Sequence, residues 1–279
     1  GIIPRQLPGH QPNSNVQNRQ AHSQPRDFSH GASLGESRET VHWLRQGLTL
    51  IGNRATVPSM SQRVPPKARI SAILVAAGLG KRMQSTISKP FLTLYGKPLF
   101  QYSLETLAKT KAISEIILVL HPRDVTAFRR TYPRLLKICR IVPGGKRRQD
   151  SVANGVKIAS PASTHILIHD AARPFARPDL IRRSLALLAK FPKLGGVIPA
   201  CPVVGTLKKA GPAQTIATTI SRVGLWEAQT PQLFHIDIFR SALARIQAKR
   251  QVTDDAQILE LSGIPVGMIA GDRYNFKIT

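Results

Sequence analysis

Hydrophobic positions are arranged differently in two parts of the chain. Residues 1–65 are rich in Gln, Asn, Ser, Pro and His, contain few apolar residues and show no periodicity. Such a segment cannot bury enough apolar surface to offset the entropy that it would lose on ordering. We therefore expect residues 1–65 to be a disordered N-terminal extension and residues 66–279 to form the folded domain.

From Ile70 onward, apolar runs of strand length alternate with segments whose apolar residues recur at helical spacing. The predicted strands are ISAILVAA, EIILVLH, KICRIVPGG, THILIHDAARP and GGVIPACPV. The predicted helices are LFQYSLETLAKT, PRDVTAFRRTYPRLL, RQDSVANGVKIAS and PDLIRRSLALLAKF. This alternation predicts the α/β class, with an open, mostly parallel sheet and helices on both of its faces. Such sheets bind ligands beyond the carboxyl ends of their strands, so the residues there are candidate site residues.

Residues 203–222 break the alternation. They contain two β-rich runs joined by Gly211 and Pro212, which predicts a protruding β-hairpin arm. A lone two-stranded ribbon is only marginally stable, so such an arm often pairs with a second subunit. The alternative is a hairpin that folds back on its own domain.

The net charge of the chain indicates the kind of partner that it binds but says little about its fold. The chain has 40 Lys and Arg residues against 15 Asp and Glu residues, a formal net charge of +25. This excess favours polyanionic partners, although a generally basic proteome would also produce it. Aromatic residues make up only 5% of the chain and no recognition helix is apparent, which disfavours nucleic acid.

Cysteine content and hydropathy bear on the cellular compartment. The two cysteines, Cys139 and Cys201, cannot form a zinc site or a disulfide framework, which fits a reducing compartment. No apolar run reaches the roughly 20 residues that span a bilayer. We expect a soluble, cytoplasmic protein without a membrane partner, with organellar targeting by the N-terminal extension as a minor alternative.

The first strand ends in a loop of small residues followed by cations. Its segment AAGLGKRM is neither a P-loop nor a dinucleotide fingerprint, because the required spacings are absent. Lys81, Arg82 and Lys89 flank this loop. Three cations beside a glycine loop can surround a triphosphate and neutralise the charge that builds on a leaving pyrophosphate. A basic surface loop is the alternative.

Several motifs together resemble one enzyme family. They are AAGLGKRM, SKPFL, GGKRRQDSV, HDAARP, GLWEAQTPQLF, TDDA and NFKIT, and they span residues 70–279. In this order and spacing they resemble the 2-C-methyl-D-erythritol 4-phosphate cytidylyltransferases, whose fold is like that of nucleotide-diphospho-sugar transferases. The resemblance implies transfer of a cytidylyl group from CTP to a sugar-alcohol phosphate, with release of pyrophosphate, in the non-mevalonate isoprenoid pathway. It implies Mg²⁺ bound mainly through the triphosphate, with no metal ligands dedicated by the protein.

The chemistry implied by the resemblance suits these residue types. The attacking phosphate oxygen is already ionised at pH 7, so no general base is needed, and catalysis reduces to positioning and charge stabilisation. The resemblance implies catalytic roles for Arg82 and Lys89 at the α-phosphate. It implies nucleotide-binding roles for Ala76, Ala77, Gly78, Gly80, Lys81, Gly144, Gly145, Arg148, Ser151, Asp170 and Ala171. It implies acceptor-positioning roles for Arg173, Thr206, Arg222 and Lys277.

Further roles follow from the same resemblance. Gly144 and Gly145 would let cytosine approach closely, and Ser151 would complement the pyrimidine edge. Asp170 would reach ribose hydroxyls or Mg²⁺. The hairpin would reach into the neighbouring subunit of a homodimer.

Some assignments have structural alternatives. Arg148 and Asp150 can form a helix-start pair without any ligand. Asp170 can form a buried structural pair with Arg173, and His169 reads as a packed histidine. The TDDA segment, with Asp254 and Asp255, reads as a helix N-cap.

The chain departs from the family pattern at Gly205 and Ser221, where an aspartate is usual, and both changes remove a carboxylate near the acceptor. Ribitol 5-phosphate is therefore an alternative acceptor, and an inactive basic remnant that binds nucleic acid is an alternative function. Family members continue beyond NFKIT into a final helix, which we expect to be missing here. Some are also fused to a cyclodiphosphate synthase domain.

Overall fold

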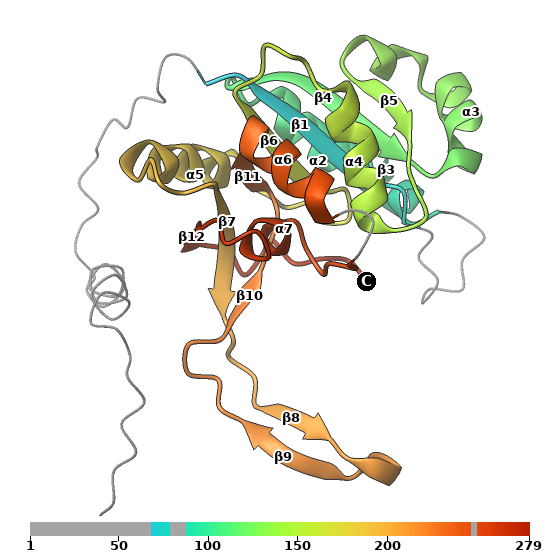
Figure 1. Ribbon diagram of the computed structural model, residues 1–279. Coiled ribbons are helices and arrows are strands. Elements are labelled where there is room, and N and C mark those ends of the chain that lie inside the picture. Colours follow the sequence, from blue (N-terminus) through green and yellow to red (C-terminus); the bar gives the residue numbers. More distant parts are fainter. Residues whose placement is uncertain (1–67, 79–87, 247–249) are drawn as a thin grey trace, which may run out of the picture. The chain divides into compact units, whose positions relative to one another are not determined.

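The computed structural model describes residues 68–78, 88–246 and 250–279, all within the second of two compact units, Ser61–Thr279 (Figure 1). The disorder expected for residues 1–65 thus lies outside the described residues. The strands of the main sheet are β1 (Ile70–Ala76), β4 (Ile113–Leu120), β5 (Arg140–Pro143), β6 (His165–Asp170), β7 (Gly196–Pro202), β10 (Trp226–Ala228), β11 (Gln232–His235) and β12 (Val266–Ala270). The α-helices are α2 (Leu99–Ala108), α3 (Pro122–Thr131), α4 (Arg148–Ile158), α5 (Pro178–Lys190), α6 (Ile236–Ile246) and α7 (Ala256–Glu260). The remaining elements are η2 (Lys89–Phe91), β2 (Thr93–Leu94), β3 (Lys97–Pro98), η3 (Pro133–Lys137), β8 (Leu207–Ala210), η4 (Pro212–Gln214) and β9 (Ile216–Ile220).

The main sheet is mostly parallel, as the sequence predicts. Its strand order is β10-β7-β11-β6-β1-β4-β5, and β12 pairs with β7. Strand β1 is parallel to β4 and β6, β4 to β5, and β7 to β12. Strands β10 and β11 run antiparallel to their neighbours. The sequence patterns do not predict β10, β11, β12 or α6.

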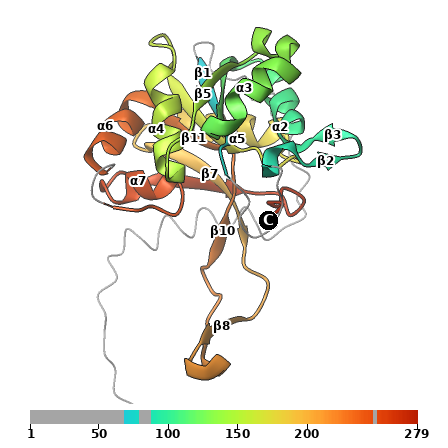
Figure 2. The same ribbon diagram turned by 90° about the vertical axis from the view of Figure 1, so that its right-hand side faces the viewer.

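Helices cover both faces of the sheet (Figure 2). Because successive side chains of a strand point to opposite faces, β1 contributes to two cores. Leu74 belongs to a core formed with α2, α3 and α5. Ile73 belongs to a second core formed with α4, α6 and α7. A sheet buried on both faces explains why its central strands are continuous apolar runs. None of the described helices has the length and apolar character needed to cross a membrane.

One predicted helix is shorter than its apolar pattern. The segment PRDVTAFRRTYPRLL predicts a continuous helix, but α3 ends at Thr131 and η3 follows it. The reason is Pro133, whose ring disfavours helical backbone at the preceding residue, Tyr132. Tyr132 accordingly has φ −123° and ψ 51°.

The segment predicted as a hairpin forms two antiparallel strands, β8 and β9, in a sheet of their own. The turn between them contains Gly211 and Pro212, as predicted. Every residue of β9 is exposed, including Ile216 at 65% and Ile220 at 40%. Pairing of this hairpin with a second subunit stays a prediction.

Candidate active site

The carboxyl ends of four adjacent strands meet at one edge of the sheet. Val75 pairs with Asp170, Ala76 with Leu120, and Leu120 with Pro143. The loops that follow β6, β1, β4 and β5 therefore lie side by side. They border a cavity of about 490 Å³, a size typical of small-molecule sites. Its described lining is Val75, Ala76, Ala77, Gly78, Lys89, Pro90, His121, Gly145, Lys146, Arg147, Arg148, Ser151, Asp170, Ala172, Lys277 and Thr279.

Most of the described residues predicted to bind nucleotide line this cavity, but two do not. Gly144 and Ala171 are absent from the lining, and Ala172 takes the place expected for Ala171. Ala171 is 1% exposed, and its N–H donates to the carbonyl of Val75 at 3.0 Å. It therefore joins β6 to β1 instead of facing the cavity.

The two glycines after β5 are required because neighbouring side chains leave no room for a Cβ atom. A Cβ added to Gly144 would lie 2.5 Å from the Cβ of Ala77 and 2.8 Å from Oγ of Ser151. A Cβ on Gly145 would lie 2.4 Å from the Cβ of Asp150. The sequence predicts that these glycines allow the close approach of a base. In the structure they first allow the loop after β5 to pack against β1 and the start of α4.

Ser151 holds the same loop together. Its hydroxyl accepts the N–H of Gly145 at 3.1 Å and donates to the carbonyl of Arg147 at 3.2 Å. The side chain is 2% exposed although it lines the cavity. Its protein contacts therefore shape the loop, and contact with a pyrimidine edge stays a prediction.

The expected pair at the start of α4 involves a different arginine. Asp150 bonds to Arg147, accepting its backbone N–H at 3.0 Å and its guanidinium at 2.7 Å. Arg148 points away from Asp150 and toward the cavity. The alternative in which Arg148 and Asp150 pair is therefore wrong.

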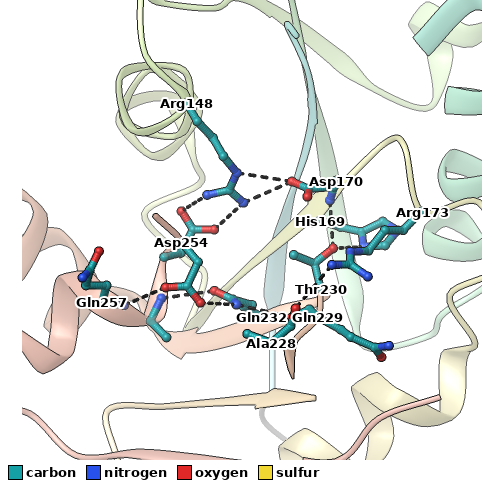
Figure 3. Close-up of polar contacts among 12 residues, drawn as sticks. Arg148, His169, Asp170, Arg173, Ala228, Gln229, Thr230, Gln232, Asp254 and Gln257 are labelled. Atoms are coloured by element: carbon teal, nitrogen blue, oxygen red, sulfur yellow. Dashed lines mark hydrogen bonds and ion pairs between the residues drawn. The ribbon is translucent and has the colours of Figure 1, made fainter. Parts of the chain in front are cut away.

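Arg148 joins two aspartates that come from distant parts of the chain (Figure 3). Its guanidinium donates to both carboxylate oxygens of Asp255, at 2.8 and 2.7 Å. It also donates to Oδ1 of Asp170, at 3.3 and 3.1 Å. Nζ of Lys277 lies 2.7 Å from Oδ2 of Asp170. The four side chains form a network of two cations and two carboxylates at one end of the cavity.

Burial and charge act in opposite directions within this network. Burial tends to raise the pKa of Asp170, but the charges of Arg148 and Lys277 outweigh it and hold that pKa well below its usual range. Asp170 is therefore an anion at neutral pH. Burial raises the pKa of Asp255, which is 0% exposed and has Arg148 as its cationic partner. For Arg148, burial lowers the pKa but the two carboxylates outweigh it, so the guanidinium stays charged.

Sequence analysis misses the role of Asp255. It treats both aspartates of TDDA as helix-capping residues, but only Asp254 behaves in this way, by accepting the N–H of Gln257 at 3.1 Å. Asp255 precedes α7 without a capping bond and turns its carboxylate to Arg148. The signal for this role in the sequence is that TDDA has two adjacent aspartates, although a helix needs only one residue as its N-cap.

Arg173 and His169 lie behind the site. Arg173 is 6% exposed and donates to the carbonyls of Asn275 at 2.7 Å and Ala228 at 3.3 Å. It is neither among the lining residues nor ion-paired with Asp170, so the buried Asp170–Arg173 pair is not present. His169 is 1% exposed and shares a 2.9 Å hydrogen bond with Thr230. Burial lowers the pKa of His169 to about 4, which fits its reading as a packed histidine.

The other predicted residues belong to the region of the glycine loop or to the hairpin. In the first region, Lys89 lines the cavity, whereas Gly80, Lys81 and Arg82 lie outside the described residues. Thr206 and Arg222 flank the hairpin strands, are exposed, and do not line the cavity of their own chain. At the departures from the family pattern, a Cβ on Gly205 would meet nothing within 4 Å. Ser221 accepts the N–H of Val223 at 3.4 Å.

The cavity provides a carboxylate that could bind a metal ion entering together with its substrate. Among the described residues, no three or more His, Cys, Asp or Glu side chains gather to hold a metal ion. Asp170 is the one carboxylate side chain among the described lining residues. Mg²⁺ commonly binds one or two carboxylates together with substrate phosphates and water. The residues therefore fit a divalent ion held mainly by ligand phosphates.

Comparison with known proteins agrees with this geometry. A family model described as IspD, 2-C-methyl-D-erythritol 4-phosphate cytidylyltransferase, matches residues 70–279. The chain is 37% identical over 215 residues to the enzyme of that name from Pelotomaculum thermopropionicum, covering 76% of this chain and 89% of the relative. The crystal structure of 4-diphosphocytidyl-2C-methyl-D-erythritol synthase from Anaerococcus prevotii matches with a TM-score of 0.64 and 30% identity, covering 76% of this chain and 91% of that one.

A longer relative has a second enzyme in its name. The chain is 39% identical over 213 residues to the bifunctional enzyme IspD/IspF of Rhodospirillum rubrum, covering 76% of this chain but only 54% of that enzyme. The chain thus spans about half the length of this bifunctional relative. With a family model matching residues 70–279 and the fold shared with solved members, the chain belongs to the IspD family of 2-C-methyl-D-erythritol 4-phosphate cytidylyltransferases.

Proposed function

We propose that this protein transfers the cytidylyl group of CTP to 2-C-methyl-D-erythritol 4-phosphate. The products are 4-diphosphocytidyl-2-C-methyl-D-erythritol, a precursor in isoprenoid biosynthesis, and pyrophosphate. Family membership supports the reaction, and the geometry of the cavity supports it independently.

The observation that carries the proposal is the order of chemical groups along the sheet edge. In the strand order β6-β1-β4-β5, Asp170 ends β6, Ala77 follows β1 and the glycines follow β5. The loop after β5 reaches back to β1, because a Cβ on Gly144 would lie 2.5 Å from that of Ala77. An extended nucleotide can lie along this edge, with its base at β5, its phosphates at the loop after β1, and the acceptor beside β6.

The reaction then needs no proton transfer from the protein. A phosphate oxygen of the acceptor forms a bond to the α-phosphorus of CTP. The bond from that phosphorus to the oxygen bridging to the β-phosphorus breaks, and pyrophosphate leaves with the electron pair. Because the attacking oxygen is already ionised, cations that hold both anions together are sufficient. The buried His169 is not required as a base.

Roles can be assigned along the same axis. Lys89 and Arg82 stabilise charge at the α-phosphate, and Lys81 and the backbone at Gly78 and Gly80 bind the other phosphates. Ala76, Ala77, Gly145 and Ser151 form the wall against the base, and Gly144, which is not a lining residue, lets the loop after β5 pack on Ala77.

At the other end of the cavity, Asp170 is placed to meet the ribose or the acceptor. Arg148 fixes its carboxylate, and Lys277 approaches it from the opposite side. Arg173 contributes from behind the cavity. Mg²⁺ bound to the triphosphate would supply further neutralisation of the leaving pyrophosphate, and Asp170 is the carboxylate side chain among the described lining residues that would bind it.

The hairpin supplies the remaining acceptor contacts in this proposal. Arg222 and Thr206 are exposed and do not line the cavity of their own chain. Apolar residues near them are exposed too, with Val204 at 60% and Val223 at 88%. Exposed apolar residues grouped on one element can mark a protein–protein contact. We propose that the hairpin packs on a second copy of the chain and that the active site is completed across this homodimer.

Pyrophosphate release tests the reaction directly. The protein is incubated with Mg²⁺, CTP and 2-C-methyl-D-erythritol 4-phosphate, with UTP and ATP as control nucleotides and ribitol 5-phosphate as control acceptor. The proposal predicts turnover with CTP and the methylerythritol phosphate. Turnover only with ribitol 5-phosphate would select the alternative acceptor, which the loss of carboxylates at Gly205 and Ser221 favours. No turnover with any pair would overturn the proposed function.

A further inference from the structure

Lys277 reaches the cavity from a segment without regular structure. Residues 271–279 contain neither helix nor strand. The side chain of Lys277 is 41% exposed, yet its Nζ lies 2.7 Å from Oδ2 of Asp170. A lysine side chain has many rotamers, so holding its ammonium at one point requires a fixed backbone. The contacts of the neighbouring residues show how this backbone is held.

Asn275 anchors the segment from the inside. It is 0% exposed although residues on either side of it are exposed. Its side-chain NH₂ donates to the carbonyl of Thr230 at 2.8 Å and to Oε1 of Gln229 at 3.3 Å. Its own N–H donates to the carbonyl of Asp272 at 2.9 Å. Asn275 thereby ties the segment to the chain that connects β10 and β11.

Arg173 holds the same residue from the opposite side. Its Nη1 donates to the backbone carbonyl of Asn275 at 2.7 Å, and its Nη2 to that of Ala228 at 3.3 Å. The segment is fixed again at the residue after Lys277, because Ile278 donates its N–H to the carbonyl of Ala172 at 2.9 Å. Lys277 is therefore bracketed by hydrogen bonds on both sides.

These contacts leave buried polar atoms unpaired. Among the described residues, the buried side-chain atoms without a hydrogen-bond partner include Nε of Arg173, Oδ1 of Asn275 and Nε2 of the adjacent His169. No described carboxylate forms an ion pair with Arg173, and burial lowers its pKa. The Arg173 side chain therefore makes its two described hydrogen bonds to backbone carbonyls, which fits a role in holding the segment that carries Lys277.

We infer that Arg173 and Asn275 are positioning residues that hold Lys277 at the acceptor end of the cavity. The inference rests on the proposed function and changes the role expected for Arg173. Arg173 acts through the backbone of Asn275 and does not touch the acceptor phosphate. Loss of either side chain lets residues 276–278 shift, and Lys277 then loses its place beside Asp170. Displacement of a positioning group by about 1 Å can lower a rate by about 100-fold.

A double-mutant cycle separates positioning from general stability. The variants are Asn275→Ala, Lys277→Ala and the double variant, assayed for kcat/KM with the methylerythritol phosphate. Asn275→Ala is expected to lower kcat/KM by tenfold or more in the natural background. In the Lys277→Ala background it should lower kcat/KM by less than twofold, because the group that it positions is gone. An equal loss in both backgrounds would show a general structural role and overturn the inference.

A second measurement does not depend on turnover. The rate at which an amine-reactive reagent modifies Lys277 is followed by mass spectrometry, with the exposed Lys193 between α5 and β7 as the internal control. Asn275→Ser, and Arg173→Lys as the milder variant, should raise the rate at Lys277 several-fold and leave Lys193 unchanged. An unchanged rate at Lys277 in folded variants would overturn the inference. If the natural protein has no cytidylyltransferase activity, the proposed function fails, whereas activity with a purely additive cycle refutes only the positioning role.

Discussion

Replacing Asp255 with asparagine should destabilise the domain much more than the same change at Asp150. Both aspartates bond to an arginine at the start of α4, so the two variants are matched in chemistry. They differ in burial, because the Asp255 side chain is 0% exposed and its partner Arg148 is 27% exposed. The corresponding values for Asp150 and Arg147 are 23% and 38%.

The expected magnitudes follow from this difference. Removing one partner of a buried ion pair costs about 3–5 kcal/mol, because the other charge is left uncompensated. Arg148 keeps Asp170 as a partner, so we expect the lower end, about 3 kcal/mol. The pair of Asp150 with Arg147 is more exposed and is largely screened by solvent, so it contributes much less. For a domain of this size, about 2–4 °C of Tm accompanies each kcal/mol, which gives a drop of about 6–12 °C for Asp255→Asn. Asp150→Asn should lower Tm by only a small fraction of that drop.

Thermal unfolding followed by circular dichroism at pH 7.5, without nucleotide, measures both shifts. Equal Tm values for Asp255→Asn and Asp150→Asn would refute the reasoning.

Other predictions concern the loops and the buried histidine. Gly144→Ala should cost about 1–3 kcal/mol and lower kcat/KM, because its Cβ would lie 2.5 Å from that of Ala77; unfolding and turnover are measured together. Burial lowers the pKa of His169 to about 4, below its unfolded value, so its contribution is present above about pH 6.5 and is lost as pH falls toward 4. Urea unfolding between pH 7 and 4 should show a flatter pH profile for His169→Gln, and parallel profiles would contradict this. Lys89→Ala should lower turnover by orders of magnitude, and a near-normal rate would remove its catalytic role. Nδ1 of His121 accepts an N–H in the first turn of α3 while the ring lines the cavity, so His121→Asn should keep Tm but raise the KM for CTP.

The sequence predicts the central sheet well because its strands are buried on both faces. Runs such as ISAILVAA need no partner to be recognised, since their apolar character is continuous. The strands that it does not predict are short or partly exposed. β10 has three residues and β11 has four, with Pro231 between them, and β12 has exposed positions. Such segments form strands only because they can pair with β7 or β6. The pairing partner cannot be identified from the local sequence.

The residues of the site also differ in whether the local sequence identifies them. Its glycine loop and Lys89 are signalled by residues close together in the sequence. The pair of Arg148 and Asp255 joins residues 107 apart, and the bond from Arg173 to Asn275 joins residues 102 apart. No local pattern identifies which arginine meets which carboxylate. Sequence analysis therefore does not identify Asp255 as the partner of Arg148 or Asn275 as the partner of Arg173, while placing both arginines near the site.

The distribution of charge around the cavity explains how one site can serve two anions. Among its described lining residues the cations are Lys89, Lys146, Arg147, Arg148 and Lys277, and the carboxylate is Asp170. Asp150 and Asp255 lie behind Arg147 and Arg148 and cancel much of their charge. Arg148 thus contributes mainly by fixing Asp170, and Lys146 forms no ion pair within the described part of the chain. A triphosphate and a phosphate together exceed the remaining positive charge, so we expect further cations to take part, which the roles proposed for Lys81 and Arg82 and a metal entering with CTP would supply.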